Sequence, residues 1–221
     1  QVKELFQRTV DTGLQHGTVT VLMDKEGYEV TTYRVDGDYE DGRHPKQVMF
    51  TSSLEEDLKR RDFTINAMAY HPERGLVDLF HGMEDMEHKI VRCVGDPMER
   101  FHEDALRILR AVRFSAQLGF TIEEKTKAGI QALAPNLKCV SAERIQTELV
   151  KLLVSPHPDY LRVAYETGIT REFLPEFDAC METEQNTPHH CYTVGEHILH
   201  SLLLVRPDKV LPVSYTHLRA H

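Results

Sequence analysis

The hydrophobic pattern of this chain changes near Gly82, and the change limits the folds that the chain can adopt. Before Gly82, short β-branched and apolar runs alternate with turn residues, which is typical of strands. After Gly82, apolar residues recur with helical spacing almost to the end of the chain. Strands followed by a run of helices predict an α+β protein, in which a mixed or antiparallel sheet with helices precedes an all-helical part.

The first part contains a predicted hairpin and a predicted helix. Residues 18–23 and 29–35 are rich in β-branched and apolar side chains, and residues 24–27 between them are typical of a turn. Ser53 is suited to cap a helix, since its side chain can accept a backbone hydrogen bond. We expect that helix to continue past Asp62.

Helices account for most of the second part, after a short strand at residues 76–80. One helix is expected to begin at Pro97, and the others are predicted at residues 103–118, 122–133, 141–154, 160–167 and 194–205. Gly119 is placed to end the helix before it, because a left-handed residue commonly follows the last helical turn.

Bulk composition excludes several classes of protein. The 221 residues include 26 Lys and Arg against 35 Asp and Glu, a net charge of −9, so RNA or nucleotide binding would depend on local basic clusters. No apolar run approaches the roughly 18 residues of a membrane span, so no membrane association is expected. The 4 cysteines form no CxxC pair and no zinc-like spacing, which favours a reducing, cytoplasmic location.

Residues 60–70 combine ligand-binding side chains with an apolar tail. The guanidiniums of Arg60 and Arg61 match phosphate oxygens, and Asp62 and Asn66 suit ribose hydroxyls or base edges. A surface helix with a charged start and a core-facing end would show the same pattern. Taken alone, the segment supports the two interpretations equally.

Residues 103–113 predict a helix face that carries a carboxylate and several guanidiniums. Asp104 and Arg107 would project side by side, and Arg110 and Arg113 would extend a basic stripe. Such pairs on an isolated helix are usually surface salt bridges. A carboxylate beside a guanidinium also matches the amino group and ring nitrogen of cytosine or adenine, whereas guanine and uracil present the opposite pattern.

Four segments occur in one order and together resemble the bacterial class II family of tRNA nucleotidyltransferases and poly(A) polymerases: residues 60–69, 78–82, 103–107 and 143–149. The resemblance extends approximately over residues 18–200. It implies a nucleotidyltransferase head that uses CTP and ATP to add CMP and AMP to the 3′ end of tRNA, without a nucleic-acid template.

The resemblance implies roles for individual residues. Arg61, Asp62 and Asn66 would hold the triphosphate and ribose of the nucleotide. Asp104 and Arg107 would select the incoming base, in agreement with their donor and acceptor pattern.

Further roles follow from the same resemblance. Arg110 resembles an additional nucleotide contact, and Glu143 and Arg144 resemble the residues that brace the neck helices. Glu29 resembles the family's supporting third carboxylate and is the candidate catalytic residue.

The family's main metal ligands are expected to lie outside the chain. In this family an Asp-x-Asp pair before the first strand binds two metal ions, which implies Mg²⁺, and the chain is expected to begin after that pair. We therefore assign no metal ligand here and expect these residues alone to be catalytically inactive.

Residues 186–197 contain clustered histidines ahead of a predicted helix, including His189, His190 and His197. Clustered histidines can bind metals, and the segment resembles the opening of an HD-type phosphohydrolase domain. A solvated helix start is the alternative interpretation.

These features predict four regions: a nucleotidyltransferase head at residues 1–82, a helical neck and RNA-binding body at 83–180, the start of an HD-like domain at 181–210, and a non-native tail at 211–221. The sequence leaves several functions open. They are CCA addition, A-adding or CC-adding activity, poly(A) addition, HD-type metal-dependent phosphohydrolysis, and RNA binding without catalysis. The sequence does not predict an oligomeric state.

Overall fold

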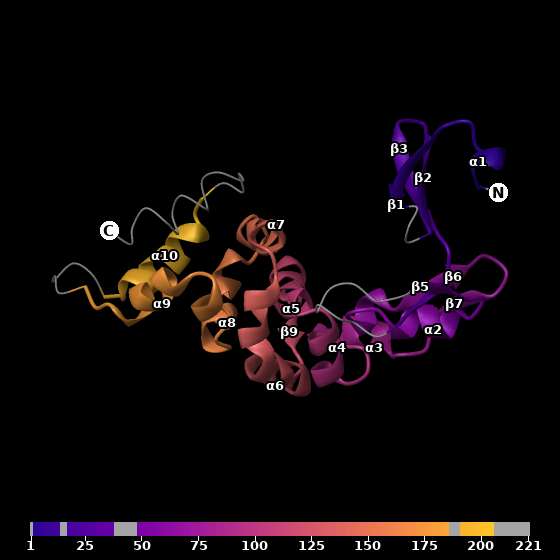
Figure 1. Cartoon of the computed structure of the whole chain (residues 1–221). Helices are drawn as coiled ribbons and strands as arrows, with labels where there is room; N and C mark the ends of the chain where they lie inside the picture. The colour runs from indigo at the N-terminus through magenta and orange to yellow at the C-terminus, as the bar shows by residue number, and fades with distance from the viewer. Residues whose placement is uncertain (1, 14–16, 38–47, 186–190, 206–221) are drawn as a thin grey trace. The chain divides into compact units, whose positions relative to one another are not determined.

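The computed structural model describes residues 2–13, 17–37, 48–185 and 191–205, which form two compact units. Within the described residues, the first unit ends at Arg61 and the second begins at Asp62. Figure 1 labels the helices and strands along the chain. Strands dominate the first unit and helices the second, so the predicted α+β class is confirmed. The predicted tail at 211–221 lies outside the described residues.

The first unit is built from small antiparallel sheets and short helices. Strands β1, β2 and β3 form one sheet in that order, and β4 pairs with β5. The bounds of its elements are α1 Val2–Leu5, β1 Thr9–Gly13, β2 Thr18–Met23, β3 Glu26–Thr31, β4 Arg34–Asp36, β5 Val48–Phe50 and α2 Leu54–Lys59.

The predicted hairpin is confirmed, but its turn is shorter and its second strand is split. Met23 pairs with Glu26, so the loop consists only of Asp24 and Lys25. Both loop residues have positive φ, 49° and 71°, as a tight hairpin turn with the twist of its strands requires. The predicted strand at 29–35 is therefore wrong as one element: β3 ends at Thr31, and β4 pairs with β5 instead.

The helix that was predicted to pass Asp62 stops earlier. Ser53 caps α2 as predicted, because its hydroxyl accepts a hydrogen bond from the Glu56 amide at 3.3 Å. The helix nevertheless ends at Lys59. Beyond it, the Asp62 carboxylate accepts from the Phe63 amide at 2.9 Å, an extended arrangement that interrupts helical hydrogen bonding.

The second unit contains two short strand pairs, one antiparallel and one parallel, and a series of helices. Its elements are η2 Thr64–Asn66, β6 Met68–His71, β7 Gly75–Asp78, α3 Gly82–Glu87, β8 Ile90–Val91, α4 Pro97–Glu103, α5 Leu106–Leu118, β9 Thr121–Ile122, α6 Glu124–Leu133, η3 Ala134–Cys139, α7 Ala142–Leu153, η4 Pro158–Tyr160, α8 Leu161–Glu166, η5 Thr170–Glu172, α9 Pro175–Glu182 and α10 Val194–Leu202.

The helix predicted at 103–118 is two helices with a break at Asp104. This residue has extended backbone angles, φ −142° and ψ 103°, and its carboxylate accepts from the Leu106 amide at 3.1 Å. A short acidic side chain that bonds to the backbone two residues ahead favours a helix start over a helix interior. The predicted end at Gly119 is confirmed, with φ 67° in the left-handed region.

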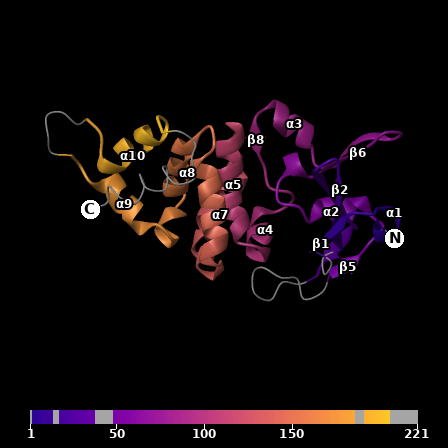
Figure 2. The ribbon, with the colours of Figure 1, turned by 90° about the horizontal axis from the view of Figure 1, so that it is seen from above.

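Helix α5 forms the centre of the second unit's core. Its residues Ile108, Leu109, Ala111 and Val112 are completely buried. Figure 2 shows α7 beside α5, and Leu152 of α7 belongs to the same buried cluster. The amphipathic pattern of both helices thus places their apolar faces against each other.

An ion pair lies inside the contact between α5 and α7. The Nε of Arg113 donates to the Glu148 carboxylate at 2.8 Å, and both side chains are more than nine-tenths buried. Burial alone would raise the pKa of Glu148, but the charge and hydrogen bond of Arg113, with a bond from Lys151, lower it below its ordinary value. Burial lowers the pKa of Arg113, which Glu148 offsets in part.

We predict that Glu148→Gln lowers the free energy of unfolding by about 3–5 kcal/mol at pH 7, because it leaves the Arg113 charge buried without a partner. The folded-state pKa of Glu148 is depressed. The ion pair therefore contributes fully to the free energy of unfolding above the pKa of Glu148 in the unfolded chain, about 4.3. This contribution is lost as the pH falls through the pKa of Glu148 in the folded chain. Urea unfolding of both chains at pH 7 and at pH 3 measures this difference, which shrinks at the lower pH.

The double variant Arg113→Met with Glu148→Leu is the control, since it removes both charges and keeps similar volume. We expect it to recover most of the lost stability. Equal destabilisation by the single and double variants would show that packing, and not the unpaired charge, causes the loss.

Candidate functional site

The segment around Asp62 is anchored to the second unit by backbone hydrogen bonds and by an aromatic contact. The Val94 amide donates to the Asp62 carbonyl, and the Thr64 amide donates to the Arg92 carbonyl, each at 3.0 Å. Phe63 between them is completely buried, and its ring meets the Phe114 ring edge to face with the centroids 5.7 Å apart. This attachment fixes the backbone from which Asp62 projects.

Three of the predicted nucleotide-binding residues meet at the Asp62 carboxylate. Arg110 of α5 donates to Oδ2 through Nε at 2.8 Å and through Nη2 at 2.6 Å. The Asn66 side-chain amide donates to Oδ1 at 3.3 Å. Asp62 and Arg110 are 48 positions apart, so folding alone brings them together. Charge-assisted bonds of this kind are the strong ones and hold the guanidinium in one orientation.

The two predicted base-selecting residues lie at the break between α4 and α5. Asp104 accepts from Nη2 of Arg144 at 2.8 Å. Arg107 donates to the Glu103 carboxylate at 2.8 Å and to the Arg100 carbonyl at 3.2 Å. The prediction that both residues lie on one helix face is wrong. Asp104 lies before the first turn of α5, and only Arg107 is in the helix.

The buried thiol of Cys93 lies near both groups of residues. Burial raises the pKa of Cys93 to about 12, while the charges of Arg107 and Arg100 lower it and those of Asp62 and Glu103 raise it. Phe63 forms an isolated β-bridge with Cys93, so this thiol lies beside the Asp62 segment.

The predicted basic stripe along α5 does not form as an exposed stripe. Arg113 is buried against Glu148, and Arg107 is bound to Glu103 and nine-tenths buried. Arg110 is the most exposed of the three, with 32% of its side chain accessible. Periodicity predicted the helix but not that its arginines would face acidic partners on other segments.

Arg61 and Glu29 belong to the first unit. Arg61 donates to the Asp57 carboxylate at 3.3 Å, and Arg60 donates to it at 2.7 Å. Asp57 is buried, which raises its pKa, but Arg60 and the Arg34 amide lower it below its ordinary value. Glu29 lies exposed on β3 and pairs in register with Thr20.

Two residues of these ion pairs were not predicted to contact site residues. Asp57 was not singled out from the sequence, and Arg144 was assigned only a bracing role. The spacing of Asp57 before the two arginines, three and four residues, is a helical ion-pair signal that could have identified it. No local signal links Arg144 to Asp104, because they are 40 positions apart.

The segment at residues 78–82 begins helix α3, which is hydrogen-bonded to the Asp62–Asn66 segment. Asp78 accepts from the amides of Gly82 and Met83, both at 2.8 Å, which satisfies the start of α3. Asp85 of α3 accepts from the Thr64 hydroxyl at 2.7 Å and from Arg92. Asp78 thus caps α3, and Asp85 of the same helix holds the Asp62–Asn66 segment through Thr64.

The described residues form neither a metal-binding cluster nor a membrane-spanning helix. Within that part of the chain, no group of three or more His, Cys, Asp or Glu side chains is arranged to hold a metal ion. His189 and His190 of the predicted HD-like cluster lie outside the described residues. In the same described part, no helix is long and apolar enough to cross a membrane.

Two protein-family profiles match the chain. One is described as the poly A polymerase head domain and matches residues 1–92. The other is described as the probable RNA and SrmB-binding site of polymerase A and matches residues 119–181.

Curated relatives agree with these matches. The chain is 50% identical over 190 residues to the CCA-adding enzyme of Pediococcus pentosaceus, covering 86% of this chain and 48% of that protein. It is 56% identical over 154 residues to the CCA-adding enzyme of Leuconostoc mesenteroides, covering 70% of this chain and 38% of that protein. The chain thus spans about half the length of the curated relatives it matches.

Solved structures share the fold. The Bacillus stearothermophilus CCA-adding enzyme in complex with CTP aligns with a TM-score of 0.70 and 31% identity, over 99% of this chain and 66% of that one. A tRNA nucleotidyltransferase complexed with a primer tRNA and an incoming ATP analog aligns with a TM-score of 0.63 and 28% identity, over 90% and 51%. The chain belongs to the family of tRNA nucleotidyltransferases and poly(A) polymerases.

We predict that Gly82→Ala destabilises the second unit by about 1–3 kcal/mol, a typical cost of overpacking. A Cβ at this position would overlap the Thr64 carbonyl oxygen and come within 3.0 Å of the Met68 sulfur. Urea unfolding of the variant and the unsubstituted chain measures the difference. Met83→Ala, in the same helix with a half-exposed side chain, is the control, and an equal effect of the two substitutions would contradict the prediction.

Proposed function

We propose that this chain is part of an RNA 3′-end nucleotidyltransferase that adds CMP and AMP to the 3′ end of tRNA without a nucleic-acid template. The observation that carries the proposal is the meeting of Asp62, Asn66 and Arg110 in the second unit. The names of the curated relatives support CCA addition as the reaction. CTP, ATP and tRNA are the proposed substrates.

Arg110 is suited to bind a phosphate group of the nucleotide. Asp62 engages its Nε and Nη2, while Nη1 makes no hydrogen bond to any described residue. The Phe114 ring lies 5.4 Å from the guanidinium carbon and limits its movement. An arginine oriented in this way offers its remaining N–H groups to an anion at little cost in conformational entropy. Arg61 is proposed to bind the triphosphate as well.

Asp62 and Asn66 are proposed to position the ribose and the triphosphate. Their mutual hydrogen bond orients the Asn66 amide, and the buried Phe63 fixes the backbone between them. Arrangements fixed before the ligand binds lose less free energy on binding.

Asp104 and Arg107 are proposed to select the base. Asp104 uses one acceptor position for Arg144 and one for the Leu106 amide. A carboxylate has about four such positions, so it can still accept from the amino group of cytosine or adenine. Arg144 would keep Asp104 oriented while the base binds.

The proposed reaction is attack by the RNA 3′-hydroxyl on the α-phosphate of CTP or ATP, with pyrophosphate leaving. The family resemblance implies Mg²⁺ for this chemistry, but the residues that the structure describes hold no suitable cluster of ligands. Glu29 is an exposed carboxylate on β3, and a single carboxylate does not hold two Mg²⁺ ions.

Poly(A) addition is the second candidate, because the profile that matches residues 1–92 is described as the poly A polymerase head domain. The nucleotide-binding residues are the same in both proposals. Only the product distinguishes them.

We predict that Asp104→Ala and Arg107→Ala in the full-length protein reduce the preference for CTP and ATP over UTP and GTP by about tenfold or more. Each change removes a charged hydrogen bond, worth about 1.5–3 kcal/mol, to the base. The ratio of kcat/KM values with each triphosphate measures the preference. Glu99→Ala on the exposed side of α4 is the control, and an unchanged preference in both test variants would remove the base-selecting role.

We also expect the purified 221-residue chain to incorporate no radiolabelled CMP or AMP into a tRNA that lacks its 3′ end. The reason is the lack of a metal-holding cluster among the described residues. The full-length protein is the positive control, and sequencing its product separates the two candidates: CCA supports the first, and a run of A supports the second. Measurable incorporation by the chain alone would overturn this expectation.

A further inference from the structure

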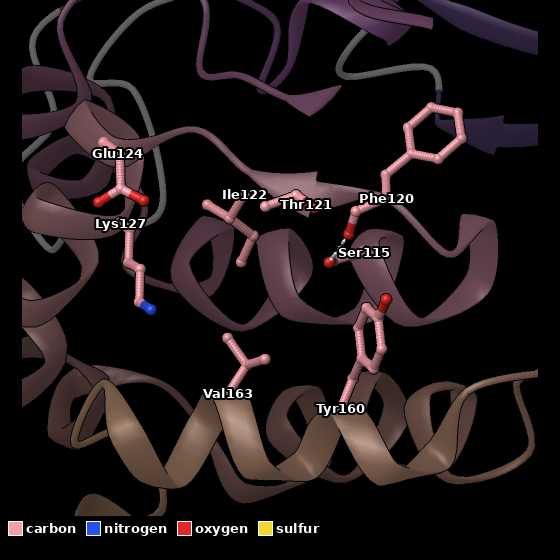
Figure 3. A pocket seen from close by; sticks show the side chains of 8 residues that line it. All are labelled: Ser115, Phe120, Thr121, Ile122, Glu124, Lys127, Tyr160 and Val163. Carbon is pink, nitrogen blue, oxygen red and sulfur yellow. Dashed lines mark hydrogen bonds between the residues drawn. The ribbon is translucent and has the colours of Figure 1, made fainter. Parts of the chain in front are cut away.

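A small cavity lies between α5, β9, α6 and the start of α8, away from the proposed nucleotide site (Figure 3). Its volume is about 160 Å³, whereas pockets for drug-sized ligands are about 300–1,000 Å³, so it suits a flat group no larger than one nucleobase. The lining residues are Ser115, Phe120, Thr121, Ile122, Glu124, Lys127, Tyr160 and Val163. All of them except Ser115 lie in the segment that matches the probable RNA-binding profile.

The cavity combines an apolar floor with an aromatic wall. Ile122 and Val163 face each other across it, and the Tyr160 ring stands at one side (Figure 3). The His157 ring packs behind Tyr160 with the centroids 5.4 Å apart. A ring supported in this way forms a wall against which a flat group can pack.

Polar groups with unused bonding capacity surround this floor. The Glu124 carboxylate, the Thr121 hydroxyl and the Tyr160 hydroxyl make no hydrogen bond to any residue in the described part of the chain. Lys127 has only a long contact, 3.9 Å, with Glu166. Glu124 and Lys127 are three apart on α6 and so share one face of the helix.

The charges argue against a phosphate as the ligand. The lining carries one carboxylate, Glu124, and one ammonium, Lys127, and Lys127 also lies 3.9 Å from Glu166 outside the lining, so no positive charge is left unopposed there. An anion would not be attracted, while a neutral ring with donors and an acceptor on one edge would satisfy the carboxylate and the ammonium together.

We propose that this cavity binds one unpaired guanine base of the RNA, an inference that rests on the proposed function having RNA as its substrate. The Glu124 carboxylate accepts from the adjacent N1–H and N2 amino groups, and Lys127 donates to O6. Guanine is the base that presents two adjacent donors beside an acceptor. Extruded bases that pack on aromatic side chains and bond along one edge are the usual form of sequence-specific RNA recognition.

Two pairs of variants of the chain test the site against simple electrostatic attraction. Filter binding with a tRNA transcript that lacks its 3′ end gives the dissociation constants. Glu124→Gln is expected to weaken binding about tenfold, as the loss of a good base-edge contact does. Attraction to the phosphate backbone alone predicts the opposite, because removing a negative charge strengthens RNA binding. Glu99→Gln, which makes the same charge change on an exposed part of α4, is the control.

Lys127→Met and Lys125→Met form the second pair. Both remove one positive charge from α6, but Lys125 faces Asp96 at 3.6 Å and does not line the cavity. We expect Lys127→Met to weaken binding several-fold more than Lys125→Met. Equal effects would identify a general electrostatic contribution and overturn the base-binding site.

Replacing unpaired guanines of the transcript by inosine, one at a time, tests the base itself. Inosine lacks the 2-amino group, so one replacement is expected to weaken binding to the unsubstituted chain and to have no further effect on Glu124→Gln. Independent effects of the two changes, or no sensitive position, would overturn the site and leave the proposed function intact. Failure of the unsubstituted chain to bind the tRNA would instead overturn the proposed RNA substrate and the cavity's ligand together.

Discussion

The second unit depends on two arginines of one buried helix. One turn apart on α5, Arg110 reaches Asp62 and Arg113 reaches Glu148, so the same helix holds the Asp62 segment and the α7 helix. Placing guanidiniums on a helix with a completely buried apolar face is costly unless each finds a carboxylate. The two acidic partners meet this requirement, and they determine which segments lie against α5.

This arrangement gives the motif residues structural roles beside the binding roles that we propose for them. Asp62 orients Arg110 and is itself a proposed nucleotide contact, and Arg144 links α7 to Asp104, a proposed base contact. A substitution at such a residue therefore changes stability and binding together. Residues with one role, such as Glu148, are the ones whose substitution separates the two effects.

Much of the secondary structure was predictable, because it depends on local preferences. The β-branched run of β2, the cap at Ser53 and the glycine at position 119 each specify backbone angles through their own chemistry. The errors occurred where a side chain or a distant segment competes for backbone hydrogen bonds. The Asp104 carboxylate breaks the predicted long helix, and the bond from Val94 to Asp62 draws the chain away from helical geometry.

The sequence by itself determined the α+β class, the order of the elements and, through four ordered motifs, the family and the candidate residues. Only the tertiary structure decided which candidates meet. It joined Asp62 to Arg110 and Asp104 to Arg144, and it buried Arg113 against Glu148 where an exposed basic stripe was expected. The physical reason is that ion pairs between segments 35 to 48 positions apart depend on how helices pack, and periodicity carries no information about the partner that a charged side chain will face.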